Sequence, residues 1–102
     1  MYIAINKCYG GFRVTKEVYD ELGLEWNGFG SLSNEDFGIE SDNYEAYRIH
    51  PKLINAIKKI GEEASSNRYS EIAIVEIPDD IDWEIYEYDG METIHEKHRK
   101  WG

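Results

Sequence analysis

The chain has 102 residues, which fits one domain, so we treat residues 1–102 as a single unit. Hydrophobic residues make up 41% of it, enough for one modest core, and the formal net charge is −10. This charge disfavours bulk attraction to duplex nucleic acid or to an anionic membrane, and we expect neither as a partner. The sequence shows no secretory leader and no apolar run that could span a bilayer, which predicts a soluble, cytoplasmic protein.

The first predicted strand is Tyr2–Asn6, in which Ile3 and Ile5 share one face. A glycine pair, Gly10-Gly11, follows almost at once. Two glycines after a strand allow either a plain tight turn or a close approach of the backbone to a ligand, and both interpretations stay open here. The glycine patterns of phosphate-binding and dinucleotide-binding loops are absent.

A short helix is predicted over residues 16–22, with Thr15 as its N-cap and Gly23 as its C-cap. The stretch that follows is long and irregular. From Glu17 to Glu45 there are nine acidic residues and no lysine or arginine. A run of this kind is either an ordinary solvated face or a surface that presents carboxylates to a basic partner.

The main predicted helix covers residues 51–64. Tyr44–Ile49 is predicted as a short strand before it, and Pro51 suits the first helical position. Apolar residues then recur at helical spacing, which indicates an amphipathic helix that lies on a sheet.

Three strands are predicted in the last third of the chain, over Glu71–Ile77, Trp83–Tyr88 and Met91–Glu96. The first is a short apolar run typical of a strand that is buried on both faces. The Asp89-Gly90 pair predicts a type I′ hairpin turn between the other two, with the face of Ile85 and Ile94 buried. A helix over residues 91–100 is the alternative.

Together these elements predict an α+β fold. About four strands form a mostly antiparallel sheet, and the main helix (residues 51–64) and the short helix (residues 16–22) pack on it. Because exposed strand edges favour self-association, we expect a homo-oligomer.

The C-terminal segment, KHRKWG, is basic, although the 26 residues before it contain ten acids and no lysine or arginine. One interpretation is structural, with the segment paired to the acidic sheet or to a neighbouring chain. The other is a grip on phosphate that the ring of Trp101 covers.

No pattern of catalytic residues is visible. Cys8 is the single cysteine, so no intrachain disulfide can form. His95 and His98 are three apart, but such a pair is a weak metal signal without a third ligand at fixed spacing. We expect no enzyme, no cofactor and no metal.

Three stretches of the chain together resemble a family of small, mostly uncharacterised proteins of tailed phages and prophages. They are INKCYGGF (residues 5–12), VEIPDDIDWEIYEYDG (residues 75–90) and EKHRKW (residues 96–101). Small phage proteins of this sort often act as counter-defence factors. Some sequester cyclic nucleotide signals of bacterial immunity and others block a CRISPR-type effector. The resemblance implies a counter-defence role in the cytoplasm of the infected bacterial host.

From these observations we expect a non-catalytic protein that sequesters a nucleotide-type immune signal, either a cyclic oligonucleotide or an ADP-ribose derivative. The alternative is an acidic inhibitor that occupies a basic, nucleic-acid-binding groove of a defence effector. A phage protein without a defence role is the third possibility. The candidate ligand-binding residues join the scarce cations to nearby glycines and aromatic rings. They are Lys7, Tyr9, Gly10, Gly11, Phe12, Arg13, Arg48, His98, Arg99 and Trp101.

Overall fold

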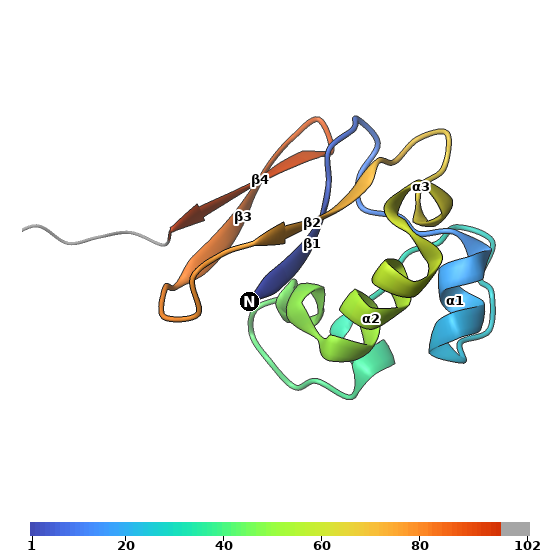
Figure 1. Cartoon of the computed structure of the whole chain (residues 1–102), viewed down its shortest axis with the longest axis horizontal. Coiled ribbons are helices and arrows are strands. Elements are labelled where there is room, and N and C mark those ends of the chain that lie inside the picture. Colours follow the sequence, from blue (N-terminus) through green and yellow to red (C-terminus); the bar gives the residue numbers. More distant parts are fainter. Residues whose placement is uncertain (97–102) are drawn as a thin grey trace, which may run out of the picture.

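The structure is a computed structural model that describes residues 1–96. It is α+β, and its elements are β1 (Tyr2–Asn6), α1 (Lys16–Leu22), the 3₁₀ helices η1 (Asn34–Phe37) and η2 (Ala46–Ile49), α2 (Pro51–Ile60), α3 (Glu62–Ser65), β2 (Ile72–Glu76), β3 (Trp83–Tyr88) and β4 (Met91–Glu96). The helices lie to one side of β1 and β2, and the β3–β4 hairpin extends on the other (Figure 1). No helix in residues 1–96 is long and apolar enough to cross a membrane.

The strands form two separate antiparallel ribbons, β1–β2 and β3–β4, and not the single four-stranded sheet that the sequence predicts. In the first ribbon Tyr2 lies opposite Glu76 and Asn6 opposite Ile72. The two ribbons share no ladder because the side chains of two charged residues, described below, occupy the free edge of β1. The prediction identified the strands but could not show which groups would pair with their edges.

The β3–β4 hairpin confirms the turn chemistry. Tyr88 lies opposite Met91, and the register continues to the far ends of both strands. Asp89 and Gly90 have φ angles of 51° and 89°, as the two central positions of a type I′ turn require. The alternative helix is therefore wrong over residues 91–96, and the rest of that range lies outside the described residues.

Burial in the ribbons is lower than the apolar patterns predict. Ile85 and Ile94 are half-buried, and the fully buried residue on their face of the hairpin is the charged Glu92. In β2 only Ile72 is fully buried. By contrast, residues 3–6 of β1 are all buried, so both faces of this strand are covered, whereas the β3–β4 hairpin extends away from the helices.

Helix α1 has the predicted bounds, and Gly23 ends it in the left-handed conformation with φ of 74°. Thr15 stands at the N-cap position, but its hydroxyl makes no capping bond. It donates instead to the Ala64 carbonyl at 2.6 Å, which ties the start of α1 to α3.

The predicted helix over residues 51–64 is interrupted. Gly61, with φ of 102°, separates α2 from the short helix α3. Pro51 occupies the first turn of α2, and the His50 ring accepts a hydrogen bond from the Lys52 amide. The predicted strand over residues 44–49 is wrong, because residues 46–49 form the 3₁₀ helix η2.

The core lies between β1, β2 and the helices. Helix α2 supplies Leu53, Ile54, Ala56 and Ile57, and all four are buried. Each fully buried aliphatic side chain of this size contributes about 1.5–3 kcal/mol to folding. The remaining members of the buried cluster are Ala4, Val14, Val18, Tyr19, Tyr47 and Ile72.

Candidate functional site

Three segments that are far apart in the sequence meet at one end of the molecule. They are residues 7–13, residues 67–71 and residues 88–90, and we call the surface they form the three-loop end. In Figure 1 it lies at the top, where the turn between β3 and β4 stands beside the loop that follows β1. It includes six of the predicted ligand-binding residues, because all six belong to the first segment.

Backbone contacts hold these segments together. The Gly10 amide donates to the Asp89 carbonyl at 3.3 Å, and the Ser70 hydroxyl donates to the Arg13 carbonyl at 2.7 Å. The first segment is thus bonded to both of the others.

The glycine pair is explained by these contacts. A Cβ atom on Gly10 would lie 2.5 Å from the Tyr69 carbonyl oxygen, and one on Gly90 would lie 2.4 Å from the amide nitrogens of Gly10 and Gly11. Both distances are far shorter than the separation that a Cβ atom keeps from atoms to which it is not bonded. The sequence left open a plain tight turn or a close approach to a ligand, and the structure shows a turn at residues 9–10 that packs closely against the chain's own backbone.

The exposed cations of the three-loop end are Lys7, Arg13 and Arg68. Within residues 1–96 none of the three takes part in an ion pair. Their charge remains available to a ligand.

Three exposed tyrosines accompany these cations. Tyr9, Tyr69 and Tyr88 are 58%, 60% and 76% exposed, and each comes from a different segment. A tyrosine ring offers a flat apolar surface for stacking and a hydroxyl for hydrogen bonding. The sequence analysis found Tyr9 but missed Arg68, Tyr69 and Tyr88, since nothing in the local pattern shows that these loops converge.

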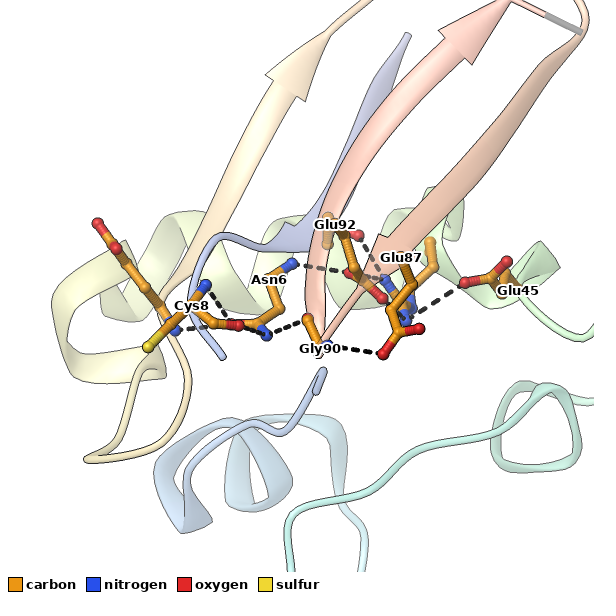
Figure 2. A network of polar contacts seen from close by, with 9 residues as sticks. Asn6, Cys8, Glu45, Glu87, Gly90 and Glu92 are labelled. Atoms are coloured by element: carbon orange, nitrogen blue, oxygen red, sulfur yellow. Dashed lines mark hydrogen bonds and ion pairs between the residues drawn. The ribbon is translucent and has the colours of Figure 1, made fainter. Parts of the chain in front are cut away.

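Arg48 lies elsewhere, in a buried ion pair. It donates to the two carboxylate oxygens of Glu92 at 2.7 and 2.9 Å, and both side chains are only 5% exposed. It also donates to the Ala4 carbonyl at 3.2 Å, while Glu92 accepts from the Asn6 amide at 2.8 Å. Figure 2 shows how Glu92 stands at the centre of this network.

Aromatic rings complete the surroundings of Arg48. The Phe12 ring lies over its guanidinium at 3.7 Å from the ring centroid, and the Tyr47 ring lies at 5.2 Å. Burial by itself lowers the pKa of Arg48, but hydrogen bonding to Glu92 and the proximity of Tyr47 outweigh it and raise the pKa above its usual value. Arg48 is therefore buried beneath the partly buried ring of Phe12, and it is not presented to solvent.

Asn6 is a further polar residue that the sequence analysis missed. Its side chain is fully buried and donates to the carbonyls of Cys8 and Gly90 at 2.6 and 2.7 Å. The side-chain oxygen accepts from the Glu71 amide at 2.8 Å. Asn6 thus joins all three segments, and the one signal for it in the sequence is an asparagine inside a strand, where this residue is uncommon.

The predicted residues His98, Arg99 and Trp101 lie outside the described part of the chain. His95 is described, and its ring stacks on Tyr86 at a centroid distance of 4.2 Å. Among residues 1–96 no group of three or more histidine, cysteine, aspartate or glutamate side chains is placed to hold a metal ion.

A second surface is an open groove of about 600 Å³ that runs along β3. One wall is the segment 41–45, with Asp42 and Glu45, and the other is β3 itself, with Trp83, Glu84 and Ile85. A hollow of about 330 Å³ continues it past Trp83 and is lined by Asn43, Ala46, Ile49, Ile81 and Asp82. We call the two together the β3 groove. Both acidic stretches of the sequence contribute carboxylates to it, and among the residues that the structure describes no lysine or arginine lines it.

Glu45 links the β3 groove to the buried ion pair. Burial raises the pKa of Glu45, the Arg48 guanidinium at 3.7 Å lowers it, and the carboxylates of Glu92 and Glu87 raise it again, so that the net shift is upward. Negative charge is thus crowded at this wall of the groove, and a cation bound there would relieve the crowding.

Comparison with protein-family models, with curated proteins and with solved structures finds no match to this chain.

Proposed function

We propose that this protein is a non-catalytic binder that sequesters a nucleotide-type ligand at the three-loop end. The observation that carries the proposal is that three segments joined through their backbones carry three exposed tyrosines and three exposed cations that form no ion pair within residues 1–96. Lysine and arginine donate charge-assisted hydrogen bonds to phosphate oxygens, and tyrosine rings stack on bases. A phosphorylated ligand that also carries a base fits both.

The composition of the proposed site differs from the list that the sequence predicts. Lys7, Tyr9 and Arg13 keep their roles as ligand contacts. Gly10 acts indirectly, because it lets the loops approach, while Gly11 has open space around it and a positive φ of 90°. Phe12 and Arg48 become supporting residues, while Arg68, Tyr69 and Tyr88 join the site. His98, Arg99 and Trp101 remain part of the proposal as additional ligand contacts.

We further propose that the binding unit is a homo-oligomer. The tyrosine rings of the three-loop end are more than half exposed, so one chain alone would leave a bound ligand open to water. Tight sequestration requires several charge-assisted bonds in a site that excludes water. A second copy that closes over the ligand would supply that shielding.

The resemblance to small proteins of tailed phages supports a counter-defence role in the cytoplasm of an infected bacterium. The immune signals that such proteins sequester are cyclic oligonucleotides and ADP-ribose derivatives. Both carry the phosphates and bases that the cations and rings of the three-loop end would recognise.

Isothermal titration calorimetry against cyclic dinucleotides, cyclic trinucleotides and ADP-ribose derivatives tests the proposal. We expect one class to bind, and we expect Arg13→Ala and Arg68→Ala each to weaken its binding about 10- to 100-fold, since a hydrogen bond to a charged group is worth about 1.5–3 kcal/mol. Lys52→Ala is the matched control, because Lys52 is an exposed cation on α2 without an ion pair within residues 1–96. Absence of binding to all three classes would remove the proposal.

A second candidate function is supported by the β3 groove. In this alternative the protein is an acidic inhibitor that occupies a basic, nucleic-acid-binding groove of a defence effector. The carboxylates of Asp42, Glu45 and Glu84 face one open space, which suits a lysine- or arginine-rich surface. We expect a basic effector to be retained at low salt and released as ionic strength rises.

Charge-neutralising substitutions separate the two candidates. Asp42→Asn with Glu84→Gln should abolish capture of a basic effector and leave nucleotide binding unchanged. The control pair Glu17→Gln with Glu63→Gln removes equal charge from exposed positions on α1 and α3 and should change neither. Capture that survives neutralisation of the groove would contradict the second candidate.

A further inference from the structure

Side chains close the free edge of β1. The carbonyl of Ala4 and the amide of Asn6 both point away from β2, where the next strand of a sheet would lie. Arg48 donates to the first at 3.2 Å, and Glu92 accepts from the second at 2.8 Å. The buried ion pair therefore takes the place of a neighbouring strand.

The outer edge of β2 is closed in the same way. The Ile72 amide donates to the Ser66 hydroxyl oxygen at 2.8 Å, and the Ile74 amide donates to the Glu62 carboxylate at 2.8 Å. Both acceptors come from α3 or the residue after it. The β1–β2 ribbon thus offers no outward-facing edge along its centre to which another strand could add.

The β3 edge of the hairpin differs. In a two-residue hairpin the pair that closes the turn, here Tyr88 and Met91, exchanges ladder bonds, and such pairs then alternate along the strands. The backbone amides and carbonyls of Trp83, Ile85 and Glu87 therefore point away from β4. Within residues 1–96 no loop or side-chain group bonds to them.

The β3 groove runs along this edge. Three consecutive residues of β3, namely Trp83, Glu84 and Ile85, line it. Trp83 and Ile85 point to one face of the strand and Glu84 to the other, so a hollow lined by all three reaches the edge of β3. An added strand would lie about 4.8 Å from β3, inside this space.

The negative charge of the β3 groove favours a positively charged occupant. Asp42, Glu45, Asp82 and Glu84 line it, and among residues 1–96 no lysine or arginine does. A β3 strand from a second copy would bring Glu84 and Glu87 into a groove that is already lined by carboxylates, and such crowding of like charges is destabilising. A segment rich in lysine or arginine would meet opposite charge and, at Trp83, an aromatic ring.

We propose that the β3 groove binds an extended, basic segment of a partner protein, which adds to β3 as an antiparallel or parallel strand. Main-chain hydrogen bonds to Trp83, Ile85 and Glu87 would supply affinity, and the surrounding carboxylates would select alternate basic side chains. This inference rests on the second candidate function, an acidic surface that meets a basic partner. It is independent of the nucleotide site at the three-loop end.

The first experiment uses a short synthetic peptide in which lysine and threonine alternate. Isothermal titration calorimetry with the full chain should show binding at low salt that weakens as salt is added. N-methylation of alternate residues blocks one edge of the peptide at a time. We expect methylation of one edge to weaken binding at least about tenfold and methylation of the other edge to leave it unchanged.

A matched pair of protein variants tests the same contact from the other side. Ile85→Pro removes the outward-facing amide, and proline is tolerated on edge strands where the amide points away from the ladder. Ile85→Ala removes the same side chain but keeps the amide. We expect Ile85→Ala to bind the peptide and Ile85→Pro to bind it at least about tenfold more weakly.

The outcomes of these experiments test strand addition to β3 separately from the second candidate function, an acidic surface that meets a basic partner. Salt-sensitive binding that ignores both N-methylation patterns would overturn strand addition and leave the acidic surface as a partner site. Absence of peptide binding at low salt would remove the inference and count against the second candidate function. Pairing of two copies through β3, seen as self-association that Ile85→Pro abolishes, would also overturn it. If Ile85→Pro disturbs the fold by circular dichroism, the methylated peptides decide.

Discussion

At the scale of single residues, the pair Arg48 and Glu92 shows how one contact can decide a fold. The two side chains are buried, joined by two hydrogen bonds, and bonded in turn to the backbone of β1. Two isolated buried charges would be costly, but each here neutralises the other and satisfies a strand edge. Arg48, which the sequence predicts as a ligand-binding residue, instead joins the β1–β2 ribbon to the β3–β4 ribbon.

The first prediction concerns this pair. Glu92→Gln should destabilise the protein by about 3–5 kcal/mol, because it leaves the Arg48 charge buried without its partner. The double substitution Arg48→Met with Glu92→Leu should cost clearly less, since it removes both charges together. Urea unfolding followed by circular dichroism measures both values. A double variant less stable than Glu92→Gln would show that the edge contacts of β1 matter more than the unpaired charge.

The second prediction concerns pH and Glu45. Its pKa in the folded protein lies above the usual value of 4.5, so the folded state takes up this proton at a higher pH than the unfolded chain does. Glu45 therefore contributes stability below its unfolded pKa and loses that contribution as the pH rises through its folded pKa.

Glu45→Gln tests this sign directly. At pH 7 we expect the melting temperature of the variant to equal or slightly exceed that of the parent protein. As the pH falls from the folded pKa of Glu45 to 4.5, we expect the parent to gain stability and the variant to show no such gain. Thermal unfolding over this pH range measures both effects, with Glu40→Gln as an exposed control. A marked loss of stability at pH 7 would mean that the contact of Glu45 with Arg48 outweighs its burial.

At the scale of elements, the β3–β4 hairpin behaves as a separate unit that docks through its turn. Gly90 lies against the backbone of Gly10 and Gly11, and its carbonyl accepts from the buried Asn6 side chain. The strands themselves are only half covered. Docking of the turn, together with the bonds of Glu92 to Arg48 and Asn6, therefore determines the position of the hairpin, and the turn also shapes the three-loop end.

The third prediction tests this docking. Gly90→Ala should destabilise the protein by more than about 2 kcal/mol, because the new Cβ would collide with two backbone amides in addition to the strain of a positive φ. Gly38→Ala is the control, since Gly38 also has a positive φ but open space around it, and we expect a cost of about 1 kcal/mol. Chemical denaturation measures the two variants. Equal costs would show that the close approach at Gly90 relaxes easily.

At the scale of the whole molecule, charge is divided between two surfaces. The unpaired cations Lys7, Arg13 and Arg68 lie at the three-loop end, while the β3 groove is lined by carboxylates. A net charge of −10 repels anions at long range, so a phosphorylated ligand must be held by local contacts. The same charge would attract a basic protein from a distance.

The fourth prediction follows from the proposed sequestration. A native mass spectrum of freshly purified protein should show a homo-oligomer, and some of that oligomer should carry a small phosphorylated molecule. We expect Arg68→Ala to remove the bound molecule without changing the subunit count, because Arg68 is exposed and forms no ion pair within the described residues. A monomer that carries no ligand would contradict the oligomeric site.

Local chemistry in the sequence determined the elements of this fold. Gly23 ended α1 and Asp89-Gly90 formed the predicted turn, because positive φ angles restrict the residue type at those positions. Amphipathic spacing likewise located α2. These features depend on residues that are close in the chain, so the pattern of letters is sufficient to predict them.

The tertiary structure decided how the elements combine and what the site contains. Arg48 and Glu92 are 44 residues apart, and their pairing divides the expected sheet into two ribbons. Arg68, Tyr69 and Tyr88 join Lys7 and its neighbours only because Asn6 and the glycines bring three loops together. Long-range contacts of this kind produce no periodic pattern in the sequence. Before the chain has folded, each of these residues could pair with many others, so the sequence alone does not show which pairs form.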